Sequence, residues 1–485
     1  MLMSKAAFVV SFLVLGVLMA GGCLTKKNPV SCVDGYCEDA TRPFCDVDGA
    51  LEGSPMTCIA VDCMPGYVAG CRADQAIVCN TSGDDFDLSH CDHGCDPISG
   101  CIVKSCIPNT TSCGDRVLEQ CDANGVLHTT ACEMSCIAAP APHCAYVSPQ
   151  YLPDVCDTIA TESARDVATL ETIDTNQSAA CNGGVVPQPG GPDLCVLRYG
   201  TFSVSSGGTA RFVGTRVVAI VTDDTLRISG TLDVSARSRV AGPGGAVGNG
   251  GQVFGAKGGG GAGFATPGAS GGSATQTGGA VNAGAANSPL VVSYLAGGFT
   301  GSVSGIGDIY WGGGGGGGAT LVSCRRSVLV DGTIQAGGGG GFGGRTFTPN
   351  GMPPYPAGGG GGGSGGYVVL QGLNINVSGV VTANGGGGGC GKPSAATMGV
   401  DGSDAQLFVT VPPACTPGSN EGAGGAGGAQ GAAPQPGGAP SGGTPGGGGG
   451  ATGFFQTYTP IGVIPALTLS AASPAFQQNK NISVR

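Results

Sequence analysis

Uninterrupted glycine runs constrain the fold of this chain more than any other feature of the sequence. Residues 312–318 are seven consecutive glycines, residues 358–363 are six, and residues 337–341 and 385–389 are blocks of five. A run without side chains has no apolar face to bury, and glycine loses more conformational entropy on ordering than any other residue. Of the 97 glycines, 16 lie in residues 1–190 and 81 in residues 191–485, so the two parts of the chain differ sharply in composition. A single large conventional core is therefore not expected.

Three segments of the glycine-rich half resemble one another, each with two short β-branched runs around a glycine. The central glycines are Gly230, Gly332 and Gly379, and the first interval, of 102 residues, is close to two steps of the second, of 47. Apolar and polar residues alternate in these segments, as in half-buried strands. Recurrence at a fixed period indicates stacked units that bury their apolar faces against neighbours. We expect an all-β fold, an elongated β-solenoid or stacked-sheet domain, with the three structural glycines at equivalent bends.

The glycine runs beside these strands permit two interpretations. In the first they are flexible loops. In the second they are packed polyglycine helices with three residues per turn, whose backbones hydrogen-bond to one another. The runs adjoin the strands repeatedly in the same register, which favours ordering of the pure runs. We expect disorder for the Pro- and Ala-rich stretch 416–445.

Cysteines between residues 32 and 144 form an internal repeat. Two groups of six have nearly the same spacing, offset by 43 residues from Cys63 to Cys106, and a further group of four precedes them. Units this small need disulfides for stability, and six cysteines allow 15 pairings among which the sequence does not choose. Metal binding by Cys91 and Cys95 with the neighbouring histidines is the disfavoured alternative, so no metal is expected. The module cysteines are Cys32, Cys37, Cys45, Cys58, Cys63, Cys71, Cys79, Cys91, Cys95, Cys101, Cys106, Cys113, Cys121, Cys132, Cys136 and Cys144.

Six further cysteines follow the module, and we expect them to form disulfides among themselves and not with the module. Cys390 with Cys415 is the favoured pair because it closes a loop rich in Pro and Gly between two glycine blocks. So many cysteines in one chain point to an oxidising compartment. The six are Cys156, Cys181, Cys195, Cys324, Cys390 and Cys415.

The first 22 residues have the pattern of a secretory signal peptide. Lys5 precedes an apolar run that is too short for a comfortable membrane span and ends in small residues directly before Cys23. Those small residues and Cys23 resemble a bacterial lipobox, and the resemblance implies lipidation of Cys23 after cleavage. Leaving Cys23 out gives 22 cysteines, an even number that can pair completely. Because Leu24 follows Cys23, the resemblance to bacterial sorting rules favours the outer membrane.

Charge and residue types argue against several functions. The net charge of −11 and the lack of a basic patch exclude a nucleic-acid surface. No histidine follows His143, which removes the commonest general base from the second half, and the few aspartates there form no catalytic motif. We therefore expect no catalysis and no cofactor. Trp311 could stack on a carbohydrate, although packing at a strand end is the commoner role.

These features predict a modular chain. The lipobox, the six-cysteine repeats and the run from residue 200 to 236 together resemble uncharacterised surface lipoproteins of myxobacterial type, and the glycine blocks also look like the polyglycine-helix tips of some phage adhesins. We expect a surface lipoprotein, anchored to the outer membrane through its lipid, with a structural or adhesive role and possible contact with cell-surface polysaccharide or matrix. The alternative is a secreted β-helix that binds or cleaves polysaccharide. The expected segments are a signal peptide (1–22), a lipidated linker (23–31), a disulfide-rich repeat module (32–146), a transition linker (147–193), a Gly-rich β-repeat domain (194–475) and a tail (476–485).

Overall fold

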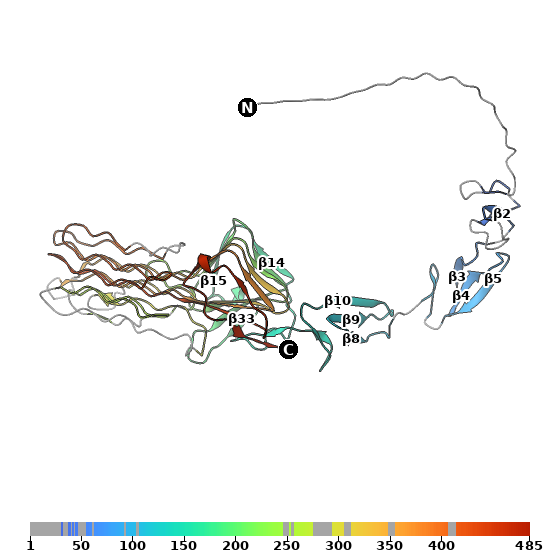
Figure 1. The fold of residues 1–485 in the computed structure, drawn as a ribbon, viewed down its shortest axis with the longest axis horizontal. Coiled ribbons are helices and arrows are strands. Elements are labelled where there is room, and N and C mark those ends of the chain that lie inside the picture. Colours follow the sequence, from blue (N-terminus) through green and yellow to red (C-terminus); the bar gives the residue numbers. More distant parts are fainter. Residues whose placement is uncertain are drawn as a thin grey trace, which may run out of the picture. The chain divides into compact units, whose positions relative to one another are not determined.

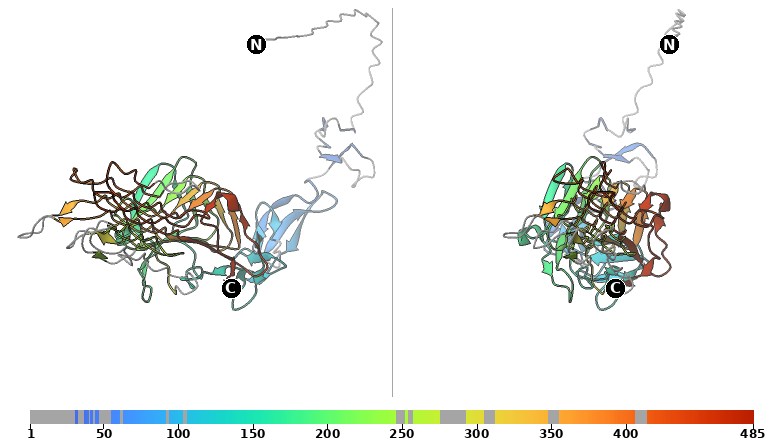
Figure 2. Two further views of the ribbon diagram at one scale, coloured as in Figure 1. Left: turned by 60° about the vertical axis from the view of Figure 1, so that its left-hand side comes forward. Right: turned by 90° about the vertical axis from the view of Figure 1, so that its left-hand side faces the viewer.

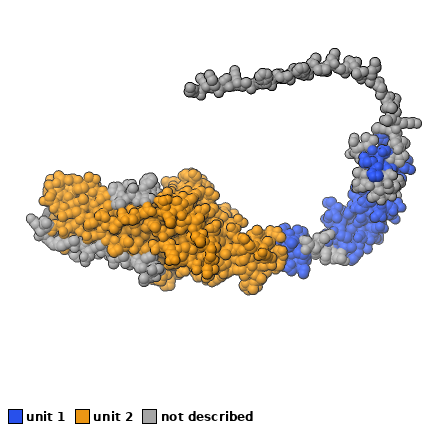
Figure 3. All heavy atoms as spheres, in the orientation of Figure 1, with its two compact units in different colours: residues 1–110, 120–128 blue, residues 111–119, 129–485 orange. Residues whose placement is uncertain are grey.

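The chain is all-β in the part that the computed structural model describes. Within that part the only helical segments are two single 3₁₀ turns, η1 (Ser178–Ala180) and η2 (Leu469–Ala471), and no helix is long and apolar enough to cross a membrane. The chain forms two compact units, residues 1–110 with 120–128 and residues 111–119 with 129–485 (Figure 3). Cys23 and Trp311 lie outside the described residues. These are 31–32, 37–39, 41–42, 44–46, 55–60, 63–91, 94–102, 106–245, 252–253, 257–274, 293–304, 312–347, 355–405 and 414–485.

The two six-cysteine groups fold as repeated units with the same disulfide pattern. In each, the first cysteine pairs with the third, the second with the fifth and the fourth with the sixth. Each six-cysteine repeat contains a three-stranded sheet and a short hairpin. The preceding group of four cysteines forms two disulfides, Cys32–Cys45 and Cys37–Cys58, which tie β1 and β2 to the residues that precede them. The strands are β1 (Phe44–Asp46), β2 (Thr57–Ile59), β3 (Val68–Arg72), β4 (Gln75–Cys79), β5 (Phe86–His90), β6 (Cys95–Asp96), β7 (Gly100–Cys101), β8 (Thr111–Cys113), β9 (Val117–Cys121), β10 (Leu127–Ala131), β11 (Cys136–Ile137) and β12 (His143–Cys144).

Three parallel sheets form a three-sided β-solenoid in the second unit. Each complete turn contributes one strand to sheet A, the next to sheet B and the third to sheet C, and equivalent strands of successive turns stack side by side (Figure 2). Only β16, at one edge of sheet A, runs antiparallel to its neighbour. Sheet A contains β16 (Val185–Val186), β17 (Leu194–Tyr199), β20 (Val217–Thr222), β25 (Ala319–Ser323), β30 (Tyr367–Gln371), β33 (Phe454–Thr459) and β36 (Lys480–Asn481). Sheet B contains β14 (Ala164–Val167), β18 (Thr201–Val204), β21 (Leu226–Ile228), β26 (Ser327–Val330), β31 (Asn374–Val377) and β34 (Ala466–Leu467). Sheet C contains β15 (Leu170–Asp174), β19 (Thr209–Val213), β22 (Thr231–Asp233), β27 (Thr333–Gln335), β32 (Val380–Thr382) and β35 (Ala472–Ser473).

The three sheets differ in how their strands are buried. In sheets B and C buried residues mostly alternate with more exposed ones, whereas β17 and β20 of sheet A are buried at every position. Near-continuous apolar strands are typical of parallel sheets covered on both faces. Residues such as Phe202 and Phe212 fill the interior of the solenoid, while Val196 and Phe264 belong to a second apolar cluster that covers the outer face of sheet A.

Gly230, Gly332 and Gly379 occupy equivalent bends between sheets B and C. The strands on both sides of them pair in register, so the glycines stack along the solenoid. A Cβ at Gly332 would collide with the carbonyl oxygen of Gly230, and one at Gly379 with that of Gly332. Close backbone approach, without a positive φ, therefore requires glycine here. Strand β21 pairs directly with β26, so Gly230 and Gly332 lie in successive turns of the solenoid. The interval of 102 residues between them therefore spans one repeat, and the expectation of two repeats was wrong.

The glycine runs form an ordered bundle of extended segments beside the solenoid (Figure 1). The run 385–391 shows the arrangement, because its backbone N–H groups point in three directions with a period of three residues. Residues 385, 388 and 391 donate to the run 422–428, residues 386 and 389 to the run 360–363, and residues 387 and 390 to the segment 400–403. Backbone amides thus replace side chains as the packing groups. Two small strand pairs are attached, β23 (Gln252–Val253) with β24 (Val303–Ser304) and β28 (Thr346–Phe347) with β29 (Tyr355–Pro356).

Three segments differ from the expected organisation. Residues 147–193 are not a linker, because β14 and β15 form the first turn of the solenoid, and β13 (Val147–Ser148) pairs with β37 (Ser483–Val484). Residues 476–485 are not a free tail, since β36 pairs with β33. The stretch 416–445 is ordered, and its residues 422–428 join the glycine bundle. In each case backbone hydrogen bonds to a neighbouring turn or glycine run order a segment whose composition alone suggested a linker, a tail or disorder.

Candidate functional site

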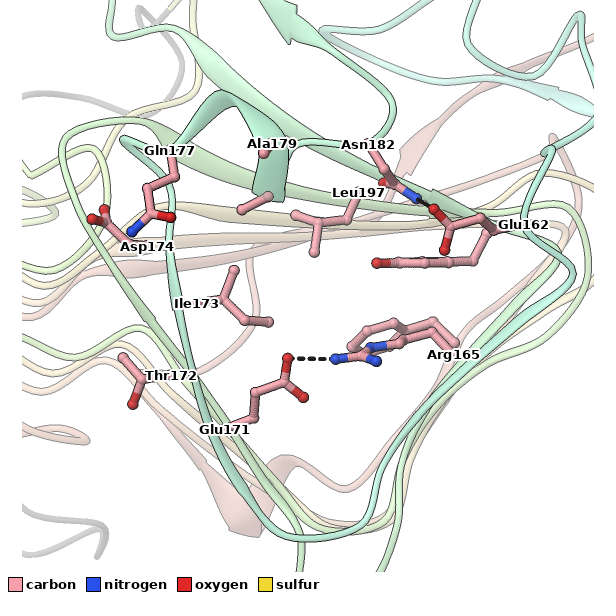
Figure 4. Close-up of a pocket in the computed structure, with 13 residues that line it drawn as sticks. Glu162, Arg165, Glu171, Thr172, Ile173, Asp174, Gln177, Ala179, Asn182 and Leu197 are labelled. Atoms are coloured by element: carbon pink, nitrogen blue, oxygen red, sulfur yellow. Dashed lines mark hydrogen bonds and ion pairs between the residues drawn. The ribbon is translucent and has the colours of Figure 1, made fainter.

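The candidate site is a cavity of about 310 Å³ at the first turn of the solenoid (Figure 4). It opens where the solenoid interior meets solvent, because strands β14 and β15 have no further turn stacked on them. The accessible lining is mainly polar, and the apolar side chains beneath it are almost fully buried. The lining residues are Glu162, Arg165, Glu171, Thr172, Ile173, Asp174, Gln177, Ala179, Ala180, Asn182, Leu197, Tyr199 and Phe202.

Strand register explains why charged groups face this cavity. Arg165 of β14 pairs in register with the buried Phe202, and Glu171 of β15 pairs with the buried Ala210 of the next turn. Both charges therefore occupy positions that hold core residues one turn further in. Such positions tolerate charge only in the end turn, where water reaches the solenoid interior.

Arg165 and Glu171 form an ion pair across the cavity (Figure 4). Glu162 accepts a hydrogen bond of 3.0 Å from the Asn182 side chain. With Asp174, three carboxylates and one guanidinium line the cavity, so its formal charge is negative. This arrangement attracts cations and offers several hydrogen-bond acceptors.

Tyr199 projects from sheet A into the solenoid interior at the cavity. Its side chain is only 7% exposed, and its ring lies 5.8 Å from that of Phe202, centroid to centroid. Burial, followed by the negative charge of Glu162, raises the pKa of Tyr199, so its hydroxyl stays protonated near neutral pH. Among the described residues that hydroxyl has no hydrogen-bond partner. The hydroxyl is therefore open to the solvent-filled cavity, where a ligand can reach it.

A buried ion pair, hydrogen bonds and a disulfide hold the loops around the cavity in place. Arg198 is buried and forms an ion pair with Asp223, and its guanidinium also donates to the carbonyl oxygen of Thr158 at 2.7 Å. Asp223 accepts a hydrogen bond from the backbone N–H of Ala160. These contacts hold the loop that leads into Glu162. The Cys181–Cys195 disulfide ties the segment that carries Gln177 and Asn182 to β17.

The site residues named from the sequence serve the scaffold. All 22 cysteines from Cys32 to Cys415 are paired, including Cys390 with Cys415 and Cys156 with Cys324. The sulfurs of Cys91 and Cys95 lie in separate disulfides and are not available as metal ligands. Sequence reasoning missed the cavity because residues 147–193 were assigned to a linker. The neighbouring β-branched residues Thr172 and Ile173 were the one local signal that could have indicated a strand there.

Comparison of the chain with family models, with curated proteins and with solved structures finds no match. The function is therefore argued from the molecule itself.

Proposed function

We propose that the protein is a lipid-anchored surface protein of the outer membrane with a structural or adhesive role. The observation that carries the proposal is the cysteine pairing: eleven disulfides use every cysteine from Cys32 onward and leave over Cys23, which follows the signal-like segment. Extensive pairing fits an oxidising compartment, and an unpaired cysteine after a lipobox-like sequence fits acylation.

The second unit suits display at a surface. Its solenoid and glycine bundle form a continuous hydrogen-bonded scaffold, and the cavity is reached from solvent at the solenoid end. A rigid scaffold with a preformed cavity binds a ligand with little ordering cost. The protein would thus present a preformed binding site at the cell surface.

One observation favours the alternative, a β-helix that cleaves polysaccharide: Glu162, Glu171 and Asp174 line the same cavity. Glycosidases use two carboxyl groups, of which one donates a proton and the other remains ionised. Here the Glu171 carboxylate is already engaged in an ion pair with Arg165 and is not free to act on a substrate. Binding without cleavage is therefore the better-supported function.

The anchor is tested by Cys23→Ala in the full-length chain expressed in a Gram-negative host. We expect the wild type in the membrane fraction with acyl mass on its N-terminus, and the variant in the soluble fraction, because the acyl chains are proposed as the only anchor. Lys26→Ala, which keeps the cysteine, is the matched control and should stay with the membrane. A variant that remains membrane-bound, with no acyl mass on the wild type, would contradict the proposal.

A further inference from the structure

We propose that the cavity at the first solenoid turn binds an amino sugar, a saccharide that carries a free ammonium group. The inference rests on the proposed binding role and names the ligand class of that site. The cavity volume of about 310 Å³ lies at the lower end of ligand pockets, which suits one sugar ring.

The negative charge of the cavity favours a positively charged ligand. Three carboxylates, those of Glu162, Glu171 and Asp174, face one guanidinium, that of Arg165. Glu171 is already paired with Arg165, whereas the Glu162 carboxylate, among the residues that the structure describes, is bonded only to the neutral amide of Asn182. The uncompensated charge near Glu162 therefore favours an ammonium group and disfavours a carboxylate or phosphate.

The rest of the lining suits a polyhydroxylated ring. The accessible lining is mainly polar, whereas Leu197 and Phe202 lie beneath it and are almost fully buried. The Tyr199 hydroxyl and the Gln177 carboxamide have no protein partner among the described residues, and both line the cavity. They offer hydrogen bonds to the sugar hydroxyls.

A simple structural role accounts for less of this lining. Charged inward-facing residues at the end of a solenoid prevent another chain from stacking on it. The Arg165–Glu171 pair would suffice for that purpose. It does not explain why the Tyr199 hydroxyl faces the cavity without a protein partner among the described residues, or why carboxylates are in excess around it.

The test uses calorimetric titration of the mature, disulfide-intact chain with D-glucosamine, glucose, N-acetylglucosamine and glucuronate. We expect glucosamine to bind most tightly and glucuronate least. Glu162→Gln, an exposed position, should weaken glucosamine binding about three- to tenfold while leaving glucose binding nearly unchanged. Tyr199→Phe should weaken both sugars. Glu133→Gln, which removes an exposed carboxylate away from the cavity, is the matched control and should change neither.

Two results would overturn the inference. One is that glucuronate binds as well as glucosamine, or that neither binds although thermal unfolding shows the chain to be folded. The other is that Glu162→Gln and Glu133→Gln behave alike. Binding of the same preparation to whole cells separates this failure from that of the proposed function: retained cell binding rejects only the amino sugar, whereas loss of cell binding and of membrane anchoring rejects the surface role as well.

Discussion

The solenoid and the glycine bundle are both ordered, but the first is packed with apolar side chains and the second with glycine backbones. In the solenoid, buried side chains such as Phe212 and Leu226 fill the space between three sheets. In the bundle the backbones themselves are in contact, and N–H groups of one run donate to carbonyl groups of its neighbours. The first core is stabilised mainly by removing apolar surface from water, and the second by satisfying backbone polar groups where no side chain intervenes. The comparison shows that regular order can arise from side-chain identity or from side-chain absence.

The largest effect is expected from removing a solenoid side chain. Phe212→Ala should lower the free energy of unfolding by about 3–5 kcal/mol, because the ring is fully buried and its removal leaves a cavity. Chemical denaturation of the second unit measures this loss. A loss below about 1 kcal/mol would mean that side-chain packing is not what stabilises the solenoid.

In the glycine bundle we expect destabilisation when a side-chain atom is added, whereas in the solenoid we expect it when side-chain atoms are removed. Gly386→Ala places a Cβ against the carbonyl group of Gly339, and the overpacking should cost about 1–3 kcal/mol. In Gly442→Ala, the matched control, the Cβ would meet only Asn420 side-chain atoms at 3.8 Å or more, and the change should be neutral or slightly stabilising through the unfolded state. Thermal melting of both variants decides the matter. Equal melting temperatures would show that the runs are loosely packed.

The smallest effect concerns carboxylates, which serve different partners in the two regions. Asp404 accepts hydrogen bonds from the backbone N–H groups of Gly340 (2.8 Å) and Ser238 (2.7 Å), so Asp404→Ala should cost about 1–2 kcal/mol through unsatisfied donors. Asp331 instead pairs with the exposed Arg227 on sheet B, and Asp331→Ala should cost less than about 1 kcal/mol. Urea denaturation compares the two. The reverse order would contradict a role for Asp404 in satisfying the bundle backbone.

The regular middle of the solenoid could be predicted from the sequence, and its ends could not. Residues around Gly332 and Gly379 carry alternating β-branched residues, because their inner faces touch apolar neighbours in both adjacent turns. The first turn lacks one neighbour, so charges such as Arg165 and Glu171 replace core residues and hide the strand pattern. The candidate site was missed for the same reason.

Long-range pairing accounts for the other differences. Strands β20 and β25 are neighbours in sheet A although residues 223–318 separate them in the sequence, and no local pattern indicates this pairing. The ordering of the stretch 416–445 likewise depends on the run 385–391 beside it. By contrast, the Cys390–Cys415 disulfide joins residues close in sequence, and the loop composition was enough to suggest it.

The three-residue period of the bundle has a consequence for how the gene can change. A run that gains or loses three residues keeps every later N–H pointing toward the same neighbouring run, one turn along it, whereas a change of one residue turns each later N–H by about 120° toward a different neighbour. For the run 385–391, which is bonded on three sides, a single-codon deletion would misdirect all of its later contacts, but a nine-nucleotide deletion would only shorten it. The bundle can therefore lengthen or shrink in steps of three codons while the solenoid beside it stays unaltered.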